Sequence, residues 1–416
     1  MSAAGQPSPV PAGSARANRV LVTATAADSI AAGVILPALP FIVFAMGGDS
    51  FYLGAVIAAF SVAGLVGAPV WGSLADRYGT RRILLIAPLV AVSGHLMFAF
   101  STSLVMLLAS RIVVGFGSAV VLLAQTHVSL SATNDTRTAL LGRVTAAQGV
   151  GTIVGPALGG LLGSHGRVTV GLVAAAGPFA AWALTLAFLP DAGPHTASGA
   201  RPKRVAAAIT ALRSRQLRSL AIAILLGWLC FSGYAAVLPV ELRAHFHLTS
   251  VTYGYIVAIS GVVALIVRGV ALGRLRKRFG ETTLMTGGAL LIAASMLLAV
   301  LIPTLWLAPL LPLTWALGAS VLFPSAVSEF GRLAPRGAVG LGMAAAAILA
   351  GTGYALGPIV AGAVAQFASV KGPFYIGALL LAVVALLARR IPAEGDAGLS
   401  AESVTDAPAG VQSAGS

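Results

Sequence analysis

Long apolar runs alternate with short polar segments along most of this chain of 416 residues. Six runs precede a polar, basic stretch at residues 190–219, and six follow it. Most are near the roughly 20 residues that an α-helix needs to cross a bilayer. The pattern predicts an all-α integral membrane protein in which twelve transmembrane helices form two pseudo-symmetric six-helix bundles. The expected spans are 20–45, 52–74, 83–100, 104–128, 140–162, 168–189, 220–240, 251–272, 283–302, 305–327, 339–367 and 373–388.

The polar segments divide the chain into five expected parts. Residues 1–18 are rich in Ala, Pro, Ser and Gly and are expected to form a disordered cytoplasmic tail. The first bundle is expected at 19–190, a cytoplasmic linker at 191–219 and the second bundle at 220–390. Residues 391–416 lack apolar periodicity and are expected to form a second disordered tail.

The fifth apolar run contains a regular series of glycines. Gly151, Gly155 and Gly159 recur every fourth residue, so on a helix they share one face and let a neighbouring backbone approach closely. Pro156 removes a backbone donor and bends the helix there, and Gly160 extends the small-residue stretch. We expect this helix and its copy at residues 353–362 on opposite sides of the interface between the bundles.

The chain is internally repeated. The glycine pattern of residues 151–160 returns 202 residues later, and the loop at 72–79 returns 201 residues later at 273–280. Pro37 in the first run matches Pro239 in the seventh, again 202 residues on. Three matches at nearly one period predict a two-fold repeated transporter.

The loops differ in charge from one side of the predicted membrane to the other. One side offers only Arg167, Arg243 and Lys371. The positive-inside rule therefore places the other side, with both termini, in the cytoplasm. The basic residues on that side are Arg77, Arg81, Arg82, Arg137, Arg143, Arg201, Lys203, Arg204, Arg274, Arg276, Lys277, Arg278, Arg332 and Arg336.

Composition supports a membrane protein and argues against other classes. The chain is 58% hydrophobic and 9% charged, with a mean hydropathy of +0.94. The net charge of +14 does not indicate nucleic-acid binding, because the basic residues occupy short loops. Cys230 is alone, which excludes disulfides and thiolate metal sites. No phosphate-binding loop, metal-ligand spacing or nucleophile elbow is present, so we expect no enzyme, cofactor, metal or ATP-driven transport.

Two motifs resemble those of a known family. The segment from Gly72 to Arg82 reads GSLADRYGTRR and resembles the loop motif of the major facilitator superfamily. Residues 151–160, which read GTIVGPALGG, are similar to the fifth-helix antiporter motif of its drug:proton antiporter branch. The resemblance covers residues 20–388 and implies the twelve-helix fold of that family. It also implies coupling of export to protons.

Two further patterns resemble the same branch. Arg111 with Gly115 and Gly117 is similar to its third motif, although Val114 stands where glutamine is common. Asp28 followed by two prolines resembles its first-helix patterns.

Asp28 and Arg111 are the candidate proton-coupling residues. Asp28 is the only acidic residue clearly inside a span, where a carboxylate costs on the order of 3 kcal/mol on insertion scales. It is therefore protonated, paired or in a watery cavity, unless its span is shorter and Asp28 lies nearer the interface. Arg111 needs an anion, a carbonyl or water, and Asp28 is the obvious partner. The alternative is an arginine that ties helices together through carbonyls.

The loop after the second run is the candidate cytoplasmic gate. Asp76 can pair with an arginine or a helix N-terminus when the cytoplasmic side closes. Gly72, Arg77, Gly79 and Arg81 complete the motif, and the family resemblance implies that this loop locks the outward-facing state. A cluster that only sets topology would explain the arginines, but not Asp76 or the glycines.

Four residues are substrate-cavity candidates. Trp228, Phe231 and Tyr234 stand at i, i+3 and i+6 in the seventh run and would suit an aromatic or amphiphilic substrate. Gln148 in the fifth run is a polar lining candidate. Helix packing or lipid contact explains the aromatic residues equally well.

These features favour a secondary active transporter, a proton-coupled antiporter that exports small, mostly apolar or cationic compounds by alternating access. An uptake or facilitative carrier of the same fold is the alternative, and a non-transporting membrane receptor is a third reading. The expected partners are a small-molecule substrate, protons and the lipid bilayer, with no nucleic acid. We expect a monomer in the plasma membrane, which is the inner membrane of a bacterium.

Overall fold

The structure is a computed structural model that describes residues 12–132, 134–190, 214–301, 307–333 and 339–391. Every regular element within these ranges is a helix. The helices of the N-terminal half are α1 (Ala12–Ala45), α2 (Ser50–Tyr78), α3 (Thr80–Leu84), α4 (Ala87–Ala99), α5 (Leu104–Gly117), α6 (Val120–Ser131), α7 (Asn134–Gly163) and α8 (Gly166–Phe188). Those of the C-terminal half are α10 (Arg215–Phe246), α11 (Ser250–Ile266), the π-helix η1 (Val267–Ala271), α12 (Leu272–Leu301), α13 (Leu310–Leu333), α14 (Val339–Phe367) and α15 (Gly372–Arg389).

The described helices account for twelve passes through a membrane. Eleven helical stretches are long and apolar enough to span one, and one of them, Ser250–Leu301, has 52 residues. At 1.5 Å per residue this stretch would be about 78 Å long, more than twice the thickness of the bilayer core. Gly280 interrupts it with φ 74° and ψ 165°, so the chain turns back and crosses twice. The prediction of twelve spans in two bundles is confirmed.

Several helix starts are fixed by local side-chain caps. Asp49 accepts a hydrogen bond from the Tyr52 amide at 2.7 Å at the start of α2. Ser103, Ser214 and Thr249 cap α5, α10 and α11 in the same way. Such caps satisfy amide groups that a helix leaves without partners, so the polar residues between the apolar runs set where each span begins.

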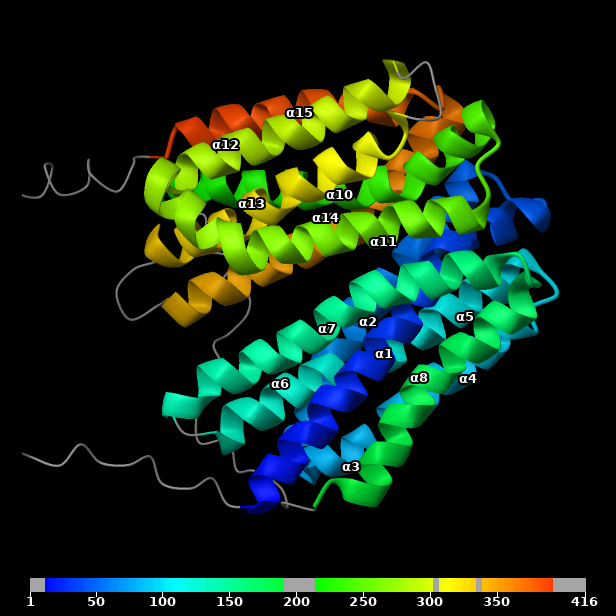
Figure 1. Cartoon of the computed structure of the whole chain (residues 1–416), viewed down its shortest axis with the longest axis vertical. Helices are drawn as coiled ribbons and strands as arrows, with labels where there is room; N and C mark the ends of the chain where they lie inside the picture. The colour runs from blue at the N-terminus through cyan, green and yellow to red at the C-terminus, as the bar shows by residue number, and fades with distance from the viewer. Residues whose placement is uncertain (1–11, 133, 191–213, 302–306, 334–338, 392–416) are drawn as a thin grey trace, which may run out of the picture.

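The internal repeat is visible in the backbone. Gly79 and Gly280, which occupy equivalent places in the repeated loop motif, have φ values of 90° and 74°. Residues with a Cβ rarely adopt such angles, so glycine permits the same sharp turn in both halves. Figure 1 shows the two helix bundles that result, with the N-terminal half in blue to green and the C-terminal half in green to red.

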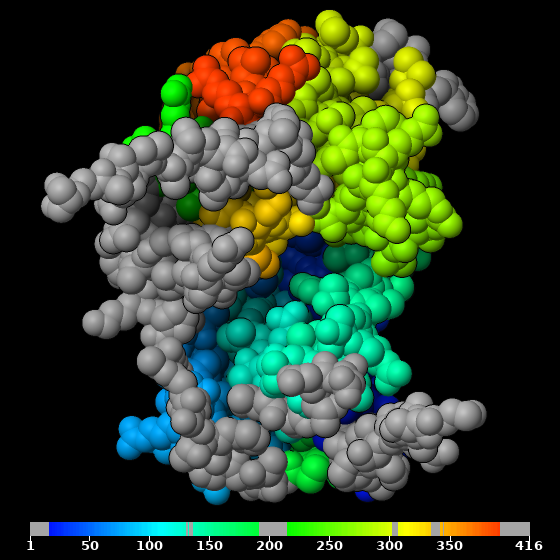
Figure 2. All heavy atoms as spheres, turned by 90° about the vertical axis from the view of Figure 1, so that its left-hand side faces the viewer, coloured from blue at the N-terminus to red at the C-terminus, as the bar shows by residue number. Residues whose placement is uncertain are grey.

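The two halves meet along two pairs of helices, α2 with α14 and α7 with α11. The side that carries Arg77, Arg81, Arg276 and Arg278 is called the basic end here, and the other side the opposite end. In Figure 1 the halves lie together at the opposite end and diverge toward the basic end. Figure 2 looks onto the basic end and shows a hollow between the halves.

The expected boundaries of the five parts stay predictions. Helix α1 begins at Ala12, earlier than the expected end of the tail at residue 18, and α10 begins at Arg215 rather than at 220. Residues 1–11, 191–213 and 392–416, which hold most of the expected tails and linker, lie outside the described part.

Candidate functional site

The glycine face of α7 packs against α1 of its own half. An ideal Cβ on Gly155 would lie 2.7 Å from the Cα of Gly33, and one on Gly151 would overlap Ser29. Gly159 meets the backbone of Val34 in the same way. We expected these glycines at the interface between the bundles, and that expectation is wrong for this face. The every-fourth spacing marks a contact within the N-terminal half, where two backbones approach too closely for any side chain.

A different face of α7 forms the contact between the halves. A Cβ on Gly160 would lie 2.8 Å from the Cα of Gly254 in α11, and the Pro156 carbonyl lies against the same Gly254. The second copy is arranged alike. Gly357 packs against α10 of its own half, and Gly362 meets the α2 backbone at Ser50 in the other half.

The contact between α7 and α11 loosens steadily toward the basic end. Gly261 would carry a Cβ 3.0 Å from the Thr152 carbonyl, and Gly149 would reach only the Leu265 side chain, at 3.7 Å. Farther along, Gly142 of α7 and Gly269 of η1, which continues α11, have no described atom within 4 Å of such a Cβ. The halves are therefore closed at the opposite end and separated at the basic end.

Asp28 lies at the middle of α1, sixteen residues after its first residue and seventeen before its last. The depth of Asp28 in the membrane stays a prediction, because α1 has 34 residues and is longer than the bilayer core is thick. The neighbouring Ala27 and Ser29 pack against α8 and α7, so Asp28 is on a third side of the helix and is half-buried. Within the described part of the chain the Asp28 carboxyl has no hydrogen bond or ion pair.

Arg111 is held inside the N-terminal half by tight packing of α5 on α2. Gly115, one turn after Arg111, lets the Phe60 backbone approach, and the Phe60 ring lies 4.7 Å from the guanidinium carbon. Arg111 is only 4% exposed, and its Nε has no hydrogen-bond partner among the described residues. The structure does not join Arg111 to Asp28 in this conformation.

Two other side chains interact electrostatically with the Arg111 guanidinium. His95 of α4, itself 3% exposed, lies within electrostatic range on the N-terminal side. Tyr354 of α14 lies within electrostatic range from the other half. Arg111 therefore interacts electrostatically with a side chain of the C-terminal half as well as with its own half.

Trp228 and Phe231 belong to an aromatic cluster that the sequence did not reveal. Trp228 stacks on Phe323 of α13 with ring centres 3.9 Å apart, and Phe231 stacks on Trp315 of α13 at 4.3 Å. Tyr354 approaches Trp228 edge-on at 5.9 Å. These five residues from α10, α13 and α14 are called the aromatic cluster below.

Tyr234 and Gln148 lie outside the aromatic cluster, although the Tyr234 ring centre is 6.0 Å from that of Trp315. Tyr234 is buried in the core of the C-terminal half, where its hydroxyl is 2.7 Å from the Ser295 hydroxyl and its ring meets Phe374 of α15. This packing is the alternative that the sequence left open. Gln148 is exposed on α7, and its lining role stays a prediction.

The gate candidates lie at the end of α2 and in α3. Gly79 makes the turn, Arg77 is exposed, and Asp76 is half-buried. Arg81 donates from Nε to the Leu189 carbonyl at 2.6 Å, which ties α3 to the end of α8 in the same half. A Cβ built on Gly72 would have no described atom within 4 Å, so none of the described residues covers this face of α2.

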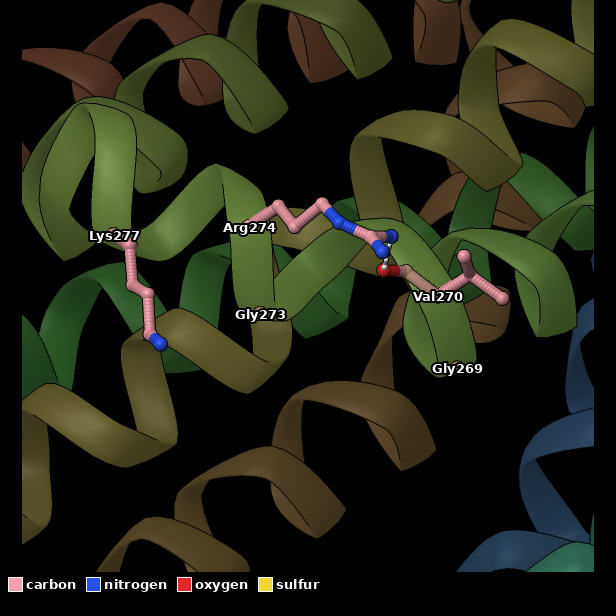
Figure 3. A pocket seen from close by; sticks show the side chains of 5 residues that line it. All are labelled: Gly269, Val270, Gly273, Arg274 and Lys277. Atoms are coloured by element: carbon pink, nitrogen blue, oxygen red, sulfur yellow. Dashed lines mark hydrogen bonds between the residues drawn. The ribbon is translucent and has the colours of Figure 1, made fainter.

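The second copy of the loop motif lines an open groove (Figure 3), formed by Gly269, Val270, Gly273, Arg274 and Lys277. All five belong to one continuous helical stretch, and Arg274 donates to the Val270 carbonyl at 3.2 Å. The groove is a basic surface at the end of the C-terminal half. It contains none of the candidate substrate residues.

A contact at the opposite end also escaped the sequence analysis. The guanidinium carbon of Arg243 in α10 lies 5.5 Å from the ring centres of both Phe41 and Phe44 in α1. From the sequence, Arg243 is only one of the few basic residues on its side of the membrane. The available signal was the spacing of Phe41 and Phe44, which stand at i and i+3 and therefore share one face of α1.

Comparison with protein families identifies one match over most of the chain. The model of the Major Facilitator Superfamily matches residues 21–326 and 220–411. The first of these matches alone covers more than half of the chain.

Individual relatives and a solved structure agree with this match. The tetracycline resistance protein of class H from Pasteurella multocida is 28% identical over 298 residues, which are 67% of this chain and 72% of the relative. Multidrug resistance protein 1 of Bacillus subtilis (strain 168) is 23% identical over 84% of this chain and 90% of its own length. The crystal structure of the human organic anion transporter MFSD10 (TETRAN) aligns with a TM-score of 0.66 at 21% identity, over 92% of this chain and 100% of that one.

Proposed function

Because the chain belongs to the major facilitator superfamily, we propose that it is a proton-coupled antiporter that exports small, mostly apolar compounds. Family membership makes it a secondary transporter in a membrane and not an enzyme. The relatives named for tetracycline and multidrug resistance support export as the direction. We place both termini and the basic end in the cytoplasm of a bacterial cell, in agreement with the positive-inside rule.

The observation that carries the proposal is the graded contact between α7 and α11. Gly160 and Gly254 touch through their backbones at one end, whereas Gly142 and Gly269 are uncovered at the other. A transporter that alternates its access needs a second state in which these contacts are exchanged. The present conformation is then the state open to the cytoplasm, which takes up the compound to be exported.

Coupling to protons is assigned to Asp28. A carboxyl group binds a proton in one state and releases it in another when its surroundings change between the states. Asp28 is at the middle of α1, is half-buried and has no partner among the described residues. Its carboxyl group can therefore be protonated in one conformation and ionised in the other. Asp76 and its neighbours are assigned to closing the cytoplasmic end in the other state.

Accumulation of tetracycline, ethidium and 2-naphthoate in cells with and without the chain tests this function. An exporter lowers the internal level of at least one compound, and an uncoupler of the proton gradient restores it. An uptake carrier raises the level instead, and a facilitative carrier is insensitive to the uncoupler. Equal levels of all three compounds in both kinds of cell would contradict transport of this class.

A further inference from the structure

Arg111 is a buried cation without a counter-charge. Its side chain is 4% exposed, its Nε has no acceptor, and it forms no ion pair among the described residues. The ion pairs in the described part join Glu241 to His245, Arg276 to Glu281 and Glu329 to Arg332, and Arg111 belongs to none of them. A buried guanidinium stays charged, so it requires an anion or several acceptors that this conformation does not show.

The aromatic cluster contains two more donors without acceptors. The indole Nε1 atoms of Trp228 and Trp315 are buried and have no hydrogen-bond partner among the described residues. Indole N–H groups usually find an acceptor when they are buried. The two tryptophans stack on Phe323 and Phe231, so their rings are packed while their polar atoms are unused.

Tyr354 connects the two sets of donors. Its ring meets Trp228 at 5.9 Å, and its hydroxyl group lies within electrostatic range of Arg111. On α14, Gly351 faces Leu65 of α2, and Gly353 faces α10. Tyr354 therefore lies on the side of α14 between its contact with α2 and its contact with α10. The line from Arg111 through Tyr354 to Trp228 crosses from one half to the other.

We infer that this line is a binding site for planar aromatic carboxylates, with the carboxylate on Arg111 and the aromatic ring on the cluster. The inference rests on the proposed function, because it names the class of compound that the exporter carries. It also revises the expectation of apolar or cationic substrates. A cation would be repelled by Arg111, and a neutral hydrocarbon would leave the Arg111 guanidinium without a counter-charge.

The chemistry of the site distinguishes charge from ring. Hydrogen bonds to charged groups are the strong ones, and a guanidinium matches the two oxygens of a carboxylate. Stacking on the cluster depends on the flat ring that all of these ligands share. Loss of Arg111 should therefore weaken only the anion, whereas loss of the cluster should weaken any flat ligand.

A matched set of three probes separates these contributions. 2-Naphthoate, 2-naphthylmethanol and 2-naphthylmethylammonium share one ring system and differ in charge. Equilibrium binding of each is measured on the purified full chain in detergent, without a proton gradient. The variants are Arg111→Gln, Arg111→Lys, Tyr354→Phe and Trp228→Leu. Arg268→Gln, at an exposed arginine of η1, is the matched control.

We expect the wild-type chain to bind naphthoate at least tenfold more tightly than the ammonium probe, a difference of about 1.4 kcal/mol. Arg111→Gln should remove that preference and leave naphthylmethanol binding unchanged, and Arg111→Lys should retain part of it. Tyr354→Phe should weaken naphthoate a few-fold. Trp228→Leu should weaken naphthoate and naphthylmethanol alike, and Arg268→Gln should change neither.

Three results would overturn the site. These are absence of naphthoate binding to the wild-type chain, tighter binding of the ammonium probe, or unchanged naphthoate affinity in Arg111→Gln. Unchanged naphthylmethanol binding shows that the Arg111→Gln variant is folded. If that variant does not fold, Arg111→Lys is used to test the effect on naphthoate affinity instead. The binding measurements need no proton gradient, so they test the site even if the cells show no uncoupler-sensitive export. The binding site and the proposed antiport function can therefore be refuted independently.

Discussion

The guanidinium carbon of Arg243 in α10 lies 5.5 Å from the centre of the Phe44 ring in α1. Phe41 lies at the same distance on the preceding turn, so one cation of the C-terminal half contacts two rings of the N-terminal half. The contact is at the opposite end, where the halves are closed. It adds a side-chain contact to the backbone contact of Gly160 with Gly254 at that end.

Replacing Arg243 by Gln should shift the protein toward the state that is open at the opposite end. Two exposed cation–π contacts contribute about 1–2 kcal/mol, roughly a 5- to 30-fold change in the ratio of states. Labelling of Ala32→Cys, one turn from Asp28, in a Cys230→Ser background reports on access from that end. A membrane-impermeant maleimide should react faster in Arg243→Gln.

Arg167→Gln is the control for this experiment. Arg167 also lies at the opposite end, but it donates to the Ala99 carbonyl at 3.3 Å and contacts Met46, both in its own half. Its loss should leave the labelling rate unchanged. Equal rates in Arg243→Gln and Arg167→Gln would show that the cation–π contact does not hold the halves together.

Gly155→Leu and Gly160→Leu should act differently, although the two residues are close in sequence. Leucine at Gly155 overlaps the α1 backbone inside one bundle, and overpacking of this kind costs about 1–3 kcal/mol, so the melting temperature in detergent should fall. Leucine at Gly160 meets the other half at Gly254, and the halves can respond by separating. Gly160→Leu should therefore keep most of its thermal stability and label faster at Ala32→Cys.

Val154→Leu, at an exposed position of α7, is the control for added volume and should change neither property. If Gly155→Leu melts as the wild-type chain does, the α1–α7 contact is not tight in solution. A large loss of stability in Gly160→Leu would show that the contact between the halves is needed for folding as well.

Sequence periodicity was sufficient for the helices and the repeat because both depend on local rules. Apolar run length sets the number of passes, and Gly79 and Gly280 reveal the repeated turn because only glycine adopts their φ values easily. The glycine spacing correctly indicated a close helix contact. It could not name the partner, since α1 and α11 present equally small residues at Gly33 and Gly254.

The aromatic cluster shows what one helix cannot reveal about its neighbours. Tyr234 was grouped with Trp228 by the i, i+3, i+6 spacing, but six residues correspond to 240° around an α-helix. The Tyr234 hydroxyl therefore meets Ser295 in the core and its ring contacts Trp315 at 6.0 Å, while Trp228 stacks on Phe323 of α13. Contacts between distant segments depend on tertiary packing, which periodicity within one helix does not encode.

Gly142→Leu and Gly269→Leu should block transport without destabilising the present conformation. Neither added side chain meets an atom within 4 Å of its Cβ, so the melting temperature should be within about 1 °C to 2 °C of the wild type, as surface substitutions usually change stability by less than 0.5 kcal/mol. Closing the basic end would bring these faces of α7 and η1 together, and leucine would hold them apart. Export should fall at least tenfold, and labelling of Ala32→Cys from the opposite end should slow. Normal export by both variants would show that the two helices do not meet there in any state.

Asp28→Asn should separate substrate movement from proton coupling. The amide matches the size of the carboxyl group but cannot bind and release a proton, so a cycle that depends on Asp28 loses its drive while the alternation of states continues. In reconstituted vesicles, an imposed pH gradient should drive uphill accumulation by the wild-type chain of whichever compound the cell assay identifies. Vesicles with Asp28→Asn should accumulate no more compound than wild-type vesicles treated with an uncoupler. They should still exchange labelled for unlabelled compound at a rate comparable to the wild type.

Asp49→Asn is the matched control, because Asp49 is an exposed N-cap outside the span, where its carboxylate accepts a hydrogen bond from the Tyr52 amide at 2.7 Å. Accumulation and exchange should both survive in this variant. Gradient-driven accumulation by Asp28→Asn at the wild-type level would place the coupling group elsewhere, and the buried His95 beside Arg111 would be the next residue to replace.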